Sequence, residues 1–363
     1  MAKKTKVLFL MDAMIMGGLE MVLKNLLDEL KHFDELDITV GAHVKEKFFR
    51  KYFKENRDKI KLIRSYPKRG AFRKLLWPLF ERHVKKALAE TDIVVDYRNG
   101  ENHHRLQNFT GKKIIWIHGG INYFKTDCAY TLDWADLIVC LTDEFKKDFI
   151  SAFPKHKNKI AHIYNASPYP EIAKRAKTDF APNLGGGGYF VSVTRIDVGQ
   201  KDVATTIRAF DKFWQDNNRP DVRLYLIGGG RRKKEMQDLA DTMPSGKNII
   251  FTGIVAEPFG YMHKSLANIL SSRYEGLPTT LIEAAAAGTM NIASDCKSGP
   301  REILLDGKAG LLFPIGDVNA LAKHMSDIYN KKVNRKKMIE NGTKALSRFD
   351  AKTVAKQVLK ILK

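Results

Sequence analysis

The stretch 271-SSRYEGLPTTLIEAAAAGT-289 joins a predicted strand to a predicted helix and carries two glutamates, Glu275 and Glu283. The run 266-LANILSS-272 is short, apolar and bounded by polar residues, which indicates a buried strand. A Gly-Leu-Pro turn interrupts it, and two threonines then offer an N-cap to a helix over 281–288, which ends on a glycine. Glu275 is therefore expected at the carboxyl end of a strand, and Glu283 in the first turns of a helix whose free amides attract anions.

Two interpretations of these acids are compatible with their spacing. In the first, they bracket the diphosphate of a nucleotide sugar, because hydroxyl groups flank that diphosphate on both sides and need acceptors. In the second, Glu283 only complements the helix dipole and Glu275 is a solvated loop acid. Other parts of the sequence have to decide between them.

The chain has 363 residues, 44% of them hydrophobic, and this length favours two domains over one ordinary core. Aliphatic runs alternate with helical patterns, as in α/β proteins. No apolar run reaches the ~18 residues of a membrane span, and the start, 1-MAKKTKVLFLMDAMIMGGLE-20, indicates a first strand and loop rather than a secretory signal. Cys128, Cys140 and Cys296 have no paired or metal-binding spacing, which favours free thiols in a reducing cytosol.

The net charge of +21 is spread unevenly, and one segment of the first half is strongly basic. Residues 45–86 hold sixteen Lys or Arg against four Asp or Glu. Within it, 47-KFFRKYFKENRDKIKLIR-64 and 69-RGAFRKLLWPLFERHVKKAL-88 interleave cations with aromatic and aliphatic residues, and both are expected to be helical. Such basic amphipathic stretches favour an anionic membrane surface as the partner. Nucleic acid is not expected, since no nucleic-acid motif accompanies the charge, and a solvated helix face with its apolar side packed inward is the other interpretation.

Strand and helix patterns divide the chain into two similar halves. Residues 1–166 are predicted to form one Rossmann-like domain and residues 189–333 a second, with loops gathered at the carboxyl ends of parallel strands. Residues 167–188 contain three prolines and four consecutive glycines without a regular period, and they are predicted to be the linker. Helices over 334–363 are expected to pack back on the first domain.

Four sequence blocks follow one another along the chain. They are 17-GGLE-20; 191-VSVTRIDVGQKD-202; 226-LIGGG-230 with 250-IFTGIV-255; and 275-EGLPTTLIEAAAAGT-289, continuing into 298-SGPREIL-304 and 309-AGLLFPIGD-317. In this order and at these separations, the sequence resembles the retaining family 4 (group 1) glycosyltransferases of bacterial surface-polysaccharide type. The resemblance implies the α/β fold called GT-B, in which two Rossmann-like domains face each other across a deep cleft.

The resemblance also assigns roles to individual residues. Arg195 and Lys201 match the basic pair that holds the donor diphosphate, and Glu283 matches the acid that accepts hydrogen bonds from the nucleotide ribose. Glu275 matches the acid that binds a hydroxyl of the transferred sugar and helps to stabilise positive charge in the transition state. His118, in 116-WIHGG-120, matches a histidine that closes over the donor sugar, although a structural histidine at a strand end is the other interpretation. The catalytic residues implied are thus Glu275, His118, Arg195 and Lys201.

The remaining donor-binding positions that the resemblance implies are Gly17, Gly18, Gly228, Val255, Gly276, Leu277, Thr280 and Leu281. The first glycine pair lets the backbone approach the donor phosphate or the acceptor, and amides from Leu277 to Leu281 would cap the phosphates. The sequence departs from the family pattern at 200-QKD-202, where Glu-Lys-Gly is usual.

The reaction expected from this resemblance is transfer of a hexose or N-acetylhexosamine from a UDP-sugar, with retention at the anomeric carbon. No side chain stands out as a nucleophile, so the leaving diphosphate is expected to deprotonate the acceptor. No Asp-x-Asp pair has a convincing context, which predicts a metal-independent enzyme with no cofactor besides its UDP-sugar substrate. The acceptor is expected to be a lipid-linked or surface glycan, such as lipopolysaccharide core or capsule. The protein would then be cytoplasmic and peripheral at the inner face of the plasma membrane.

Two other classes of function are alternatives to a glycosyltransferase. A non-catalytic nucleotide-sugar-binding partner of another transferase would keep donor binding and lack turnover. A Rossmann oxidoreductase is less compatible with the sequence, because no Gly-x-Gly-x-x-Gly follows the first strand.

Overall fold

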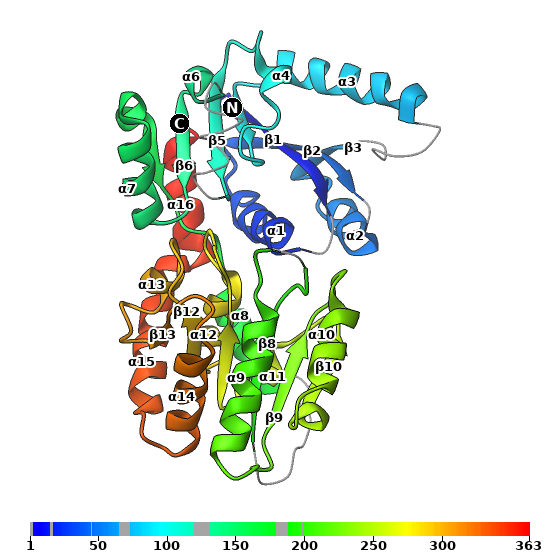
Figure 1. Ribbon diagram of the computed structural model, residues 1–363. Coiled ribbons are helices and arrows are strands. Elements are labelled where there is room, and N and C mark those ends of the chain that lie inside the picture. Colours follow the sequence, from blue (N-terminus) through cyan, green and yellow to red (C-terminus); the bar gives the residue numbers. More distant parts are fainter. Residues whose placement is uncertain are drawn as a thin grey trace. The chain divides into compact units, whose positions relative to one another are not determined.

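The computed structural model describes residues 3–14, 17–44, 46–64, 73–119, 131–178, 188–197 and 199–363, with the backbone alone for 12–13, 64, 73–77 and 131. The chain divides into two compact units (Figure 1). Unit 1 consists of Met1–Ala166 and Ala351–Lys363, and unit 2 of Ser167–Asp350.

Unit 1 is built on one parallel sheet with the strand order β3-β2-β1-β4-β5-β6-β7. Its strands are β1 (Thr5–Met14), β2 (Leu36–Val44), β3 (Ile60–Arg64), β4 (Ile93–Asp96), β5 (Lys112–Ile117), β6 (Leu137–Cys140) and β7 (Ile160–His162). Its helices are α1 (Gly18–Leu30), α2 (Lys47–Glu55), α3 (Arg73–Ala89), α4 (His103–Leu106), α6 (Thr131–Trp134), α7 (Asp143–Ala152), η2 (Pro154–Lys159) and α16 (Ala351–Ile361). Leu8 and Leu10 of β1 pack against Phe80, Val84 and Leu88 of α3, so that helix covers one face of the sheet.

Unit 2 is built on a second parallel sheet with the order β10-β9-β8-β11-β12-β13. Its strands are β8 (Tyr189–Val193), β9 (Arg223–Ile227), β10 (Ile249–Gly253), β11 (Ala267–Leu270), β12 (Asn291–Ser294) and β13 (Gly310–Phe313). Its helices are α8 (Tyr169–Thr178), α9 (Val203–Asp216), α10 (Lys233–Asp241), η3 (Gly246–Asn248), α11 (Phe259–Lys264), α12 (Thr279–Ala286), α13 (Pro300–Ile303), α14 (Val318–Tyr329), α15 (Arg335–Ala345) and η4 (Leu346–Phe349).

Alternate residues of the strands in unit 2 feed two separate cores. Phe190 and Leu226 pack with apolar side chains of α9, α10 and α14 on one face of the sheet. Val191 and Ile227, their neighbours in sequence, pack with α8, α11 and α12 on the other face. A sheet covered on both faces by helices explains why its strands read as continuous apolar runs. The predicted α/β class with two Rossmann-like halves is therefore confirmed.

Two segments differ from the sequence prediction. Residues 60–64, expected to belong to a basic helix, form the edge strand β3, because the chain turns at 56–59 and Ile60 then packs inward. Part of the predicted linker is the helix α8, whose Ile172 and Ala176 are buried in unit 2. That helix is short and begins directly after Pro168, so its period is hard to recognise in the sequence.

The carboxyl-terminal helix α16 belongs to unit 1 and packs beside α1. Two contacts hold its end in place: Lys112 Nζ donates to the carbonyl of Ile361 at 2.7 Å, and Lys363 pairs with Glu35 at 3.0 Å. The final residues of the chain therefore complete the first unit rather than the second.

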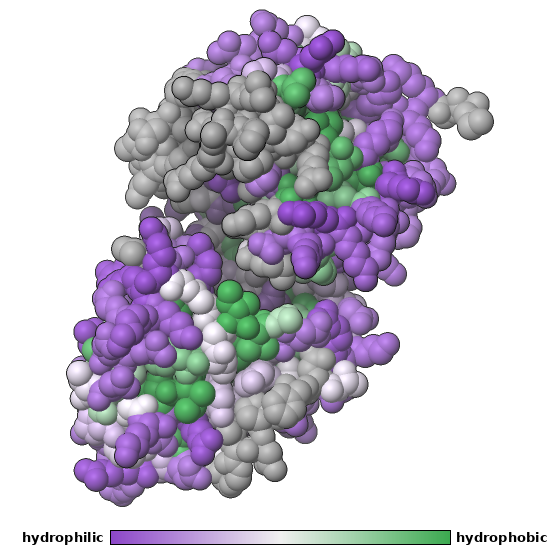
Figure 2. Space-filling view, turned by 90° about the vertical axis from the view of Figure 1, so that its right-hand side faces the viewer, coloured by the Kyte–Doolittle hydropathy of each residue, from purple (hydrophilic) through white to green (hydrophobic). Residues whose placement is uncertain are grey.

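The described helices, the surface and the cysteines can be compared with the expectations from the sequence. Within the described ranges, every helix is too short or too polar to span a bilayer. On the face shown in Figure 2, hydrophilic residues dominate and apolar residues gather in small areas. Cys140 and Cys296 are buried free thiols, whereas Cys128 lies outside the described residues.

Candidate functional site

The carboxyl ends of β8, β9, β11 and β12 lie at one edge of the sheet in unit 2, because all of these strands are parallel. In open α/β sheets, ligands bind outside this edge. The loops that leave it carry Arg195 and Lys201 after β8, Gly228 after β9, and Glu275 after β11.

A buried ion pair joins two of these loops. Lys201 Nζ contacts Glu275 Oε1, and the two side chains are only 13% and 6% exposed. Ser272 Oγ donates to the same oxygen at 2.6 Å, and Gln200 Nε2 donates to Glu275 Oε2 at 3.3 Å. Both carboxylate oxygens thus have hydrogen-bond donors, which is the condition for keeping a charged group in a buried position.

The backbone explains how residues 74 positions apart meet. Lys201 and Ser272 form an antiparallel bridge. On either side of it, Arg273 N donates to the Gln200 carbonyl and Asp202 N donates to the Ser271 carbonyl, both at 2.9 Å. The loop after β8 is therefore fastened to the loop after β11 by a short ladder.

Arg195 lies at the exposed side of this network. Its side chain is 66% exposed, and one guanidinium nitrogen donates to Gln200 Oε1 at 3.2 Å. A carboxylate oxygen of Asp197 lies 3.9 Å from the guanidinium. Gln200 therefore links Arg195 to Glu275, a role that the sequence analysis missed, although its departure from the family pattern marked the position.

Glu283 is on α12, the helix that follows Glu275. Loss of water around its carboxyl raises the pKa to about 7, and a hydrogen bond from Thr279 opposes that shift. Thr279 and Thr280, predicted to cap this helix, are instead its first two residues, and the cap residue Pro278 provides no side-chain acceptor. This leaves the first amides of α12 without a side-chain partner at the cap, as an anion would require.

Other predicted donor-binding residues of unit 2 lie at the same edge, where their side chains are buried or absent. Leu277 and Leu281 are 5% and 0% exposed, so their side chains are not available to a ligand, and the Leu281 amide already donates to the Pro278 carbonyl at 3.2 Å. Gly228 has φ +143°, and an added Cβ would lie 1.9 Å from the Thr194 carbonyl, so β8 and β9 approach here as only glycine allows.

Two further residues were not singled out from the sequence. A Cβ on Gly299 would lie 2.5 Å from the carbonyl of Gly276, so the loop after β12 packs directly on the turn before α12. Ile254 is 82% exposed, next to the partly buried Val255 and close to Gly229. An exposed aliphatic side chain between two glycine-containing loops is a candidate platform for a flat ring.

The predicted residues of unit 1 lie at the carboxyl edge of its own sheet. His118 follows β5, and Asn99 Oδ1 accepts from the backbone amides of His118 and Gly119 at 2.7 and 3.2 Å. Burial and the nearby Arg98 lower the pKa of His118 to about 3, and its Nε2 is buried without a hydrogen-bond partner. The imidazole is therefore neutral and can offer one hydrogen bond.

The glycine pair after β1 opens helix α1. Gly17 is the N-cap residue, and a Cβ there would lie 2.5 Å from the carboxylate of Glu20. Gly18 is exposed. Within the described ranges, the structure has no group of three His, Cys, Asp or Glu side chains arranged to hold a metal ion.

Part of the chain matches a known protein family. Residues 174–345 match the family model of the glycosyl transferases group 1. The matched region contains the buried pair, Arg195 and the whole of α12. The chain is thus similar to the group 1 glycosyltransferases over most of unit 2.

Two known transferases and one solved structure are similar to this chain. The chain is 29% identical to the lipopolysaccharide 1,6-galactosyltransferase of Salmonella typhimurium over 73% of this chain and 72% of that protein. It is 27% identical, over 67% of this chain and 63% of the relative, to an α-N-acetylgalactosaminyltransferase of Campylobacter jejuni that acts on a diphospho-undecaprenol-linked sugar. The structure of Anabaena HepE in complex with UDP and glucose superposes with a TM-score of 0.78 at 18% identity, covering 99% of both chains. The last comparison shows that the two Rossmann-like halves have the GT-B fold.

Proposed function

We propose that the protein is a retaining, metal-independent glycosyltransferase of family 4 that transfers a hexose or N-acetylhexosamine from a UDP-sugar to a lipid-linked or surface glycan. The observation that carries this proposal is the buried Lys201–Glu275 pair, linked through Gln200 to the exposed Arg195. Two cations and one carboxylate at the edge of a Rossmann-like sheet suit a substrate that contains both a diphosphate and hydroxyl groups.

The chemistry assigned to these groups is electrostatic. Breaking the bond between the sugar and the diphosphate places negative charge on the leaving group, which Lys201 and Arg195 stabilise. Lys201 has three N–H donors, so it can keep Glu275 and still donate to a phosphate oxygen. The diphosphate then removes the proton of the acceptor hydroxyl on the same face of the sugar, which gives retention. No covalent bond to the protein is formed in this scheme.

The donor is proposed to lie along α12. Its first amides face the phosphates, and the carboxylate of Glu283 accepts from the ribose hydroxyls. Gly228 and Val255 lie beside the nucleotide in this assignment, and UDP is the proposed nucleotide because the HepE structure contains UDP. The cationic pair replaces a divalent metal ion, so acceptor-independent turnover should persist in excess chelator.

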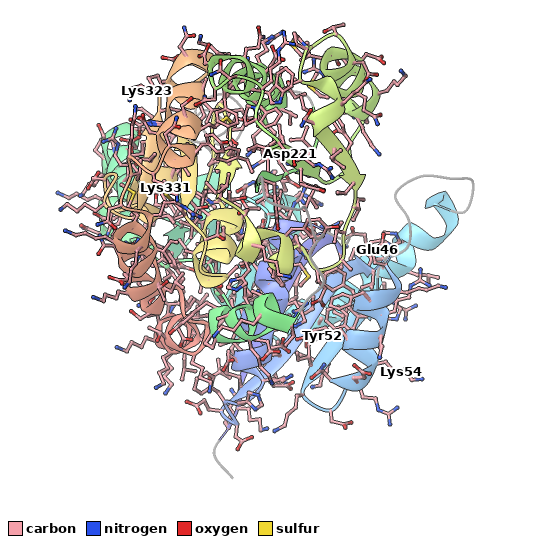
Figure 3. The ribbon with its side chains drawn as sticks, turned by 90° about the horizontal axis from the view of Figure 1, so that it is seen from below. Glu46, Tyr52, Lys54, Asp221, Lys323 and Lys331 are labelled. Atoms are coloured by element: carbon pink, nitrogen blue, oxygen red, sulfur yellow. The ribbon has the colours of Figure 1, made fainter. Side chains whose placement is uncertain are left out.

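The acceptor is proposed to be a lipid-linked or surface glycan, used at the inner face of the plasma membrane. Two relatives act on lipopolysaccharide or on an undecaprenol-linked sugar. In unit 1, α2 exposes Lys47, Arg50, Lys51 and Lys54, whereas most of its aromatic side chains are buried. Figure 3 shows Lys54 on the outward side of this helix. Phe48, 44% exposed, is the apolar exception on α2, so the proposed attraction to anionic lipid is mainly electrostatic.

Vesicle sedimentation tests the membrane part. Reversing Lys47, Lys51 and Lys54 to Glu should weaken binding to anionic vesicles by roughly 100-fold or more, since each cation contributes about 1 kcal/mol. The matched control reverses Lys336, Lys337 and Lys344 on α15, which should leave binding nearly unchanged. An equal loss in both triple variants would mean that net charge, and not α2, drives the association.

Release of UDP without acceptor tests the catalytic part. A panel of UDP-sugars is offered to the wild type, to Glu275→Gln, to Glu283→Gln and to the control Glu340→Gln, which alters an exposed acid of α15. Slow release from one donor by the wild type and the control, lost in the other two variants, is the expected result. UDP binding without turnover of any donor, even with candidate acceptors, would favour the non-catalytic partner. Absence of UDP binding would overturn the proposal.

A further inference from the structure

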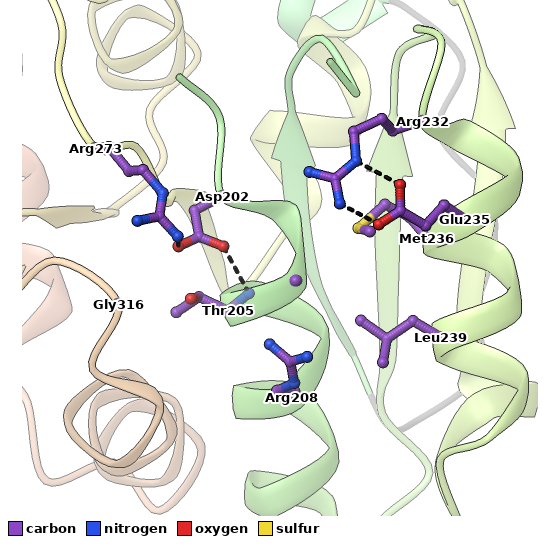
Figure 4. Close-up of a pocket in the computed structure, with 10 residues that line it drawn as sticks. Asp202, Thr205, Arg208, Arg232, Glu235, Met236, Leu239, Arg273 and Gly316 are labelled. Carbon is purple, nitrogen blue, oxygen red and sulfur yellow. Dashed lines mark hydrogen bonds and ion pairs between the residues drawn. The ribbon is translucent and has the colours of Figure 1, made fainter. Parts of the chain in front are cut away.

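An open pocket of about 540 Å³ lies in unit 2, next to the buried ion pair but with a separate lining. It lies between the start of α9, helix α10, the loop after β11 and Gly316 (Figure 4). Met236 and Leu239 of α10 give it one apolar wall. Its volume is that of a pocket for a small organic ligand.

Three arginines line this pocket, and they are not equivalent. Arg232 is paired with Glu235, and Arg273 donates to Asp202 at 3.1 Å. Arg208, exposed on α9, has no hydrogen-bond or ion-pair partner within the described residues and lies between the two pairs (Figure 4). The lining therefore has one uncompensated guanidinium, a group whose geometry suits phosphate oxygens.

The Asp202–Arg273 pair has one exposed member. Arg273 is 60% exposed, whereas Asp202 is 11% exposed and also caps α9, because its Oδ1 accepts from Thr205 N at 3.3 Å. When Arg273 leaves, Asp202 keeps the contact with Thr205 and its Oδ2 loses a donor. Arg273 is thus the movable member, and Arg208 lines the same pocket.

We propose that this pocket binds a small phosphate ester of sugar size, with its phosphate on Arg208 and Arg273 and its remaining atoms against Met236 and Leu239. A phosphate suits this lining because its uncompensated charge is a guanidinium. A sugar-sized remainder fits beside the phosphate because the pocket, of about 540 Å³, is larger than one anion.

The pocket is connected to the candidate catalytic pair by the ladder between the two loops. Arg273 N donates to the carbonyl of Gln200, and Asp202 directly follows Lys201 in sequence. Movement of Arg273 towards a ligand therefore changes the segment that holds Lys201 against Glu275. Binding in the pocket is proposed to change the affinity for the nucleotide, and this second part rests on the proposed function.

Isothermal titration of the full chain with glucose 6-phosphate as the probe tests the first part, at about 0.15 M salt to screen weak surface attraction. The wild type should bind it more tightly than inorganic phosphate and should not bind glucose. Arg208→Ala should weaken binding about tenfold or more, the loss expected for one charge-assisted contact. Lys212→Ala removes a cation one turn further along α9, outside the pocket, and should bind like the wild type. No binding, or equal binding by Arg208→Ala and the wild type, would overturn the site.

A second titration separates this inference from the proposed function. UDP is titrated with and without glucose 6-phosphate, and the two ligands should change each other's affinity by the same factor, as linkage requires. Arg273→Ala should abolish that factor. Glucose 6-phosphate binding with an unchanged UDP affinity would contradict the coupling. A protein that binds glucose 6-phosphate but not UDP would contradict the proposed function and leave the pocket standing.

Discussion

The carboxyl edges of the two sheets share a strand order, but different interactions hold their loops. In unit 2 the edge carries ionised side chains, with Lys201 against Glu275 and Arg195 nearby. In unit 1, burial lowers the pKa of His118 to about 3 and raises that of Asp96, a shift that hydrogen bonds from Asn102 and Arg98 oppose. A shared strand order therefore determines where the loops gather, and a few residues in those loops determine the interactions that hold them.

Hydrogen bonds to side chains hold the loops at the edge of unit 1, where Arg98 and Glu101 also form an ion pair at 3.5 Å. Asp96 accepts from the backbone amides of Arg98 and Asn102 and from the Asn102 side chain, at 2.8 to 3.0 Å. Asn99 then holds the turn that contains His118. Unit 1 therefore offers preformed polar contacts where unit 2 has a buried ion pair.

Removal of the cation from the buried pair should have the largest effect. Lys201→Met leaves Glu275 buried without its partner, which should destabilise unit 2 by about 3–5 kcal/mol. UDP release should fall by about 10²–10³-fold, the usual loss for one electrostatic group. Thermal unfolding and acceptor-free turnover measure the two effects.

Two control variants sharpen that result. Lys323→Met breaks the exposed pair with Asp327 and should change stability by less than about 0.5 kcal/mol. Lys201→Met combined with Glu275→Gln should recover most of the stability and none of the activity, because no buried charge then lacks a partner. Full stability in the single variant would show that the pair is not buried in solution.

The raised pKa of Glu283 gives the next largest effect, with a defined sign. Its ordinary value is 4.5 and its folded value about 7, so the folded state keeps a proton that the unfolded state releases between these values. The contribution of Glu283 to stability is therefore complete below pH 4.5 and is lost as the pH rises to 7, by at most about 3 kcal/mol because the side chain is partly exposed.

Glu283→Gln should remove this pH dependence. The variant should equal the wild type near pH 4.5 and exceed it in unfolding midpoint at pH 8, by several degrees. Glu340→Gln alters an exposed acid and should follow the wild type at every pH. Parallel curves for wild type and Glu283→Gln would mean that this carboxyl is well solvated.

Much of the fold was predictable from the sequence, and the failures have physical causes. The buried strands of both sheets are short apolar runs, which is how strands covered on both faces appear. β3 was missed because the basic residues 57–64 alternate with apolar ones in a way that suits an exposed helix as well as an edge strand. The helix α8 was missed because Pro168 precedes it and Pro170 is its second residue, and prolines usually indicate a loop.

The site was predictable as a set of residues and not as a geometry. Resemblance supplied Lys201 and Glu275, but no local pattern relates residues that meet only through the bridge between Lys201 and Ser272. Gln200 and Ser272 were missed because their contacts with Glu275 form only when the loops after β8 and β11 meet in the folded chain. Asn99 was missed because its φ of 58° and its contacts with the His118 turn exist only in the folded chain.

Substitution of Asn99, at the edge of unit 1, should have a smaller effect on stability and turnover. Asn99→Ala loses two hydrogen bonds to backbone amides and places alanine at a positive φ, for a cost of about 1–3 kcal/mol. Turnover should fall about tenfold as the His118 turn loosens. Asn99→Gly accepts the backbone angle without the hydrogen bonds, so it should recover part of the stability and little of the activity. Wild-type activity in both variants would remove His118 from the proposed machinery.

The smallest effect expected is at Gln200, where the chain departs from the usual glutamate. Its amide nitrogen donates to Glu275 Oε2 and to the Tyr274 carbonyl, and its amide oxygen accepts from Arg195. Gln200→Glu keeps the acceptor for Arg195, loses both donors and adds a negative charge beside Glu275. UDP affinity should fall several-fold, since net hydrogen-bond contributions are about 0.5–1.5 kcal/mol.

Gln200→Ala serves as the matched variant, because it removes the donors and the acceptor without adding charge. If the ionised edge of unit 2 depends on its charge balance, Gln200→Glu should bind UDP more weakly than Gln200→Ala, and the difference should shrink at high salt as screening increases. If the two variants behave alike at every salt concentration, the hydrogen bonds of Gln200 matter and its neutrality does not. The contrast between the two edges would then rest on the buried pair of Lys201 and Glu275 alone.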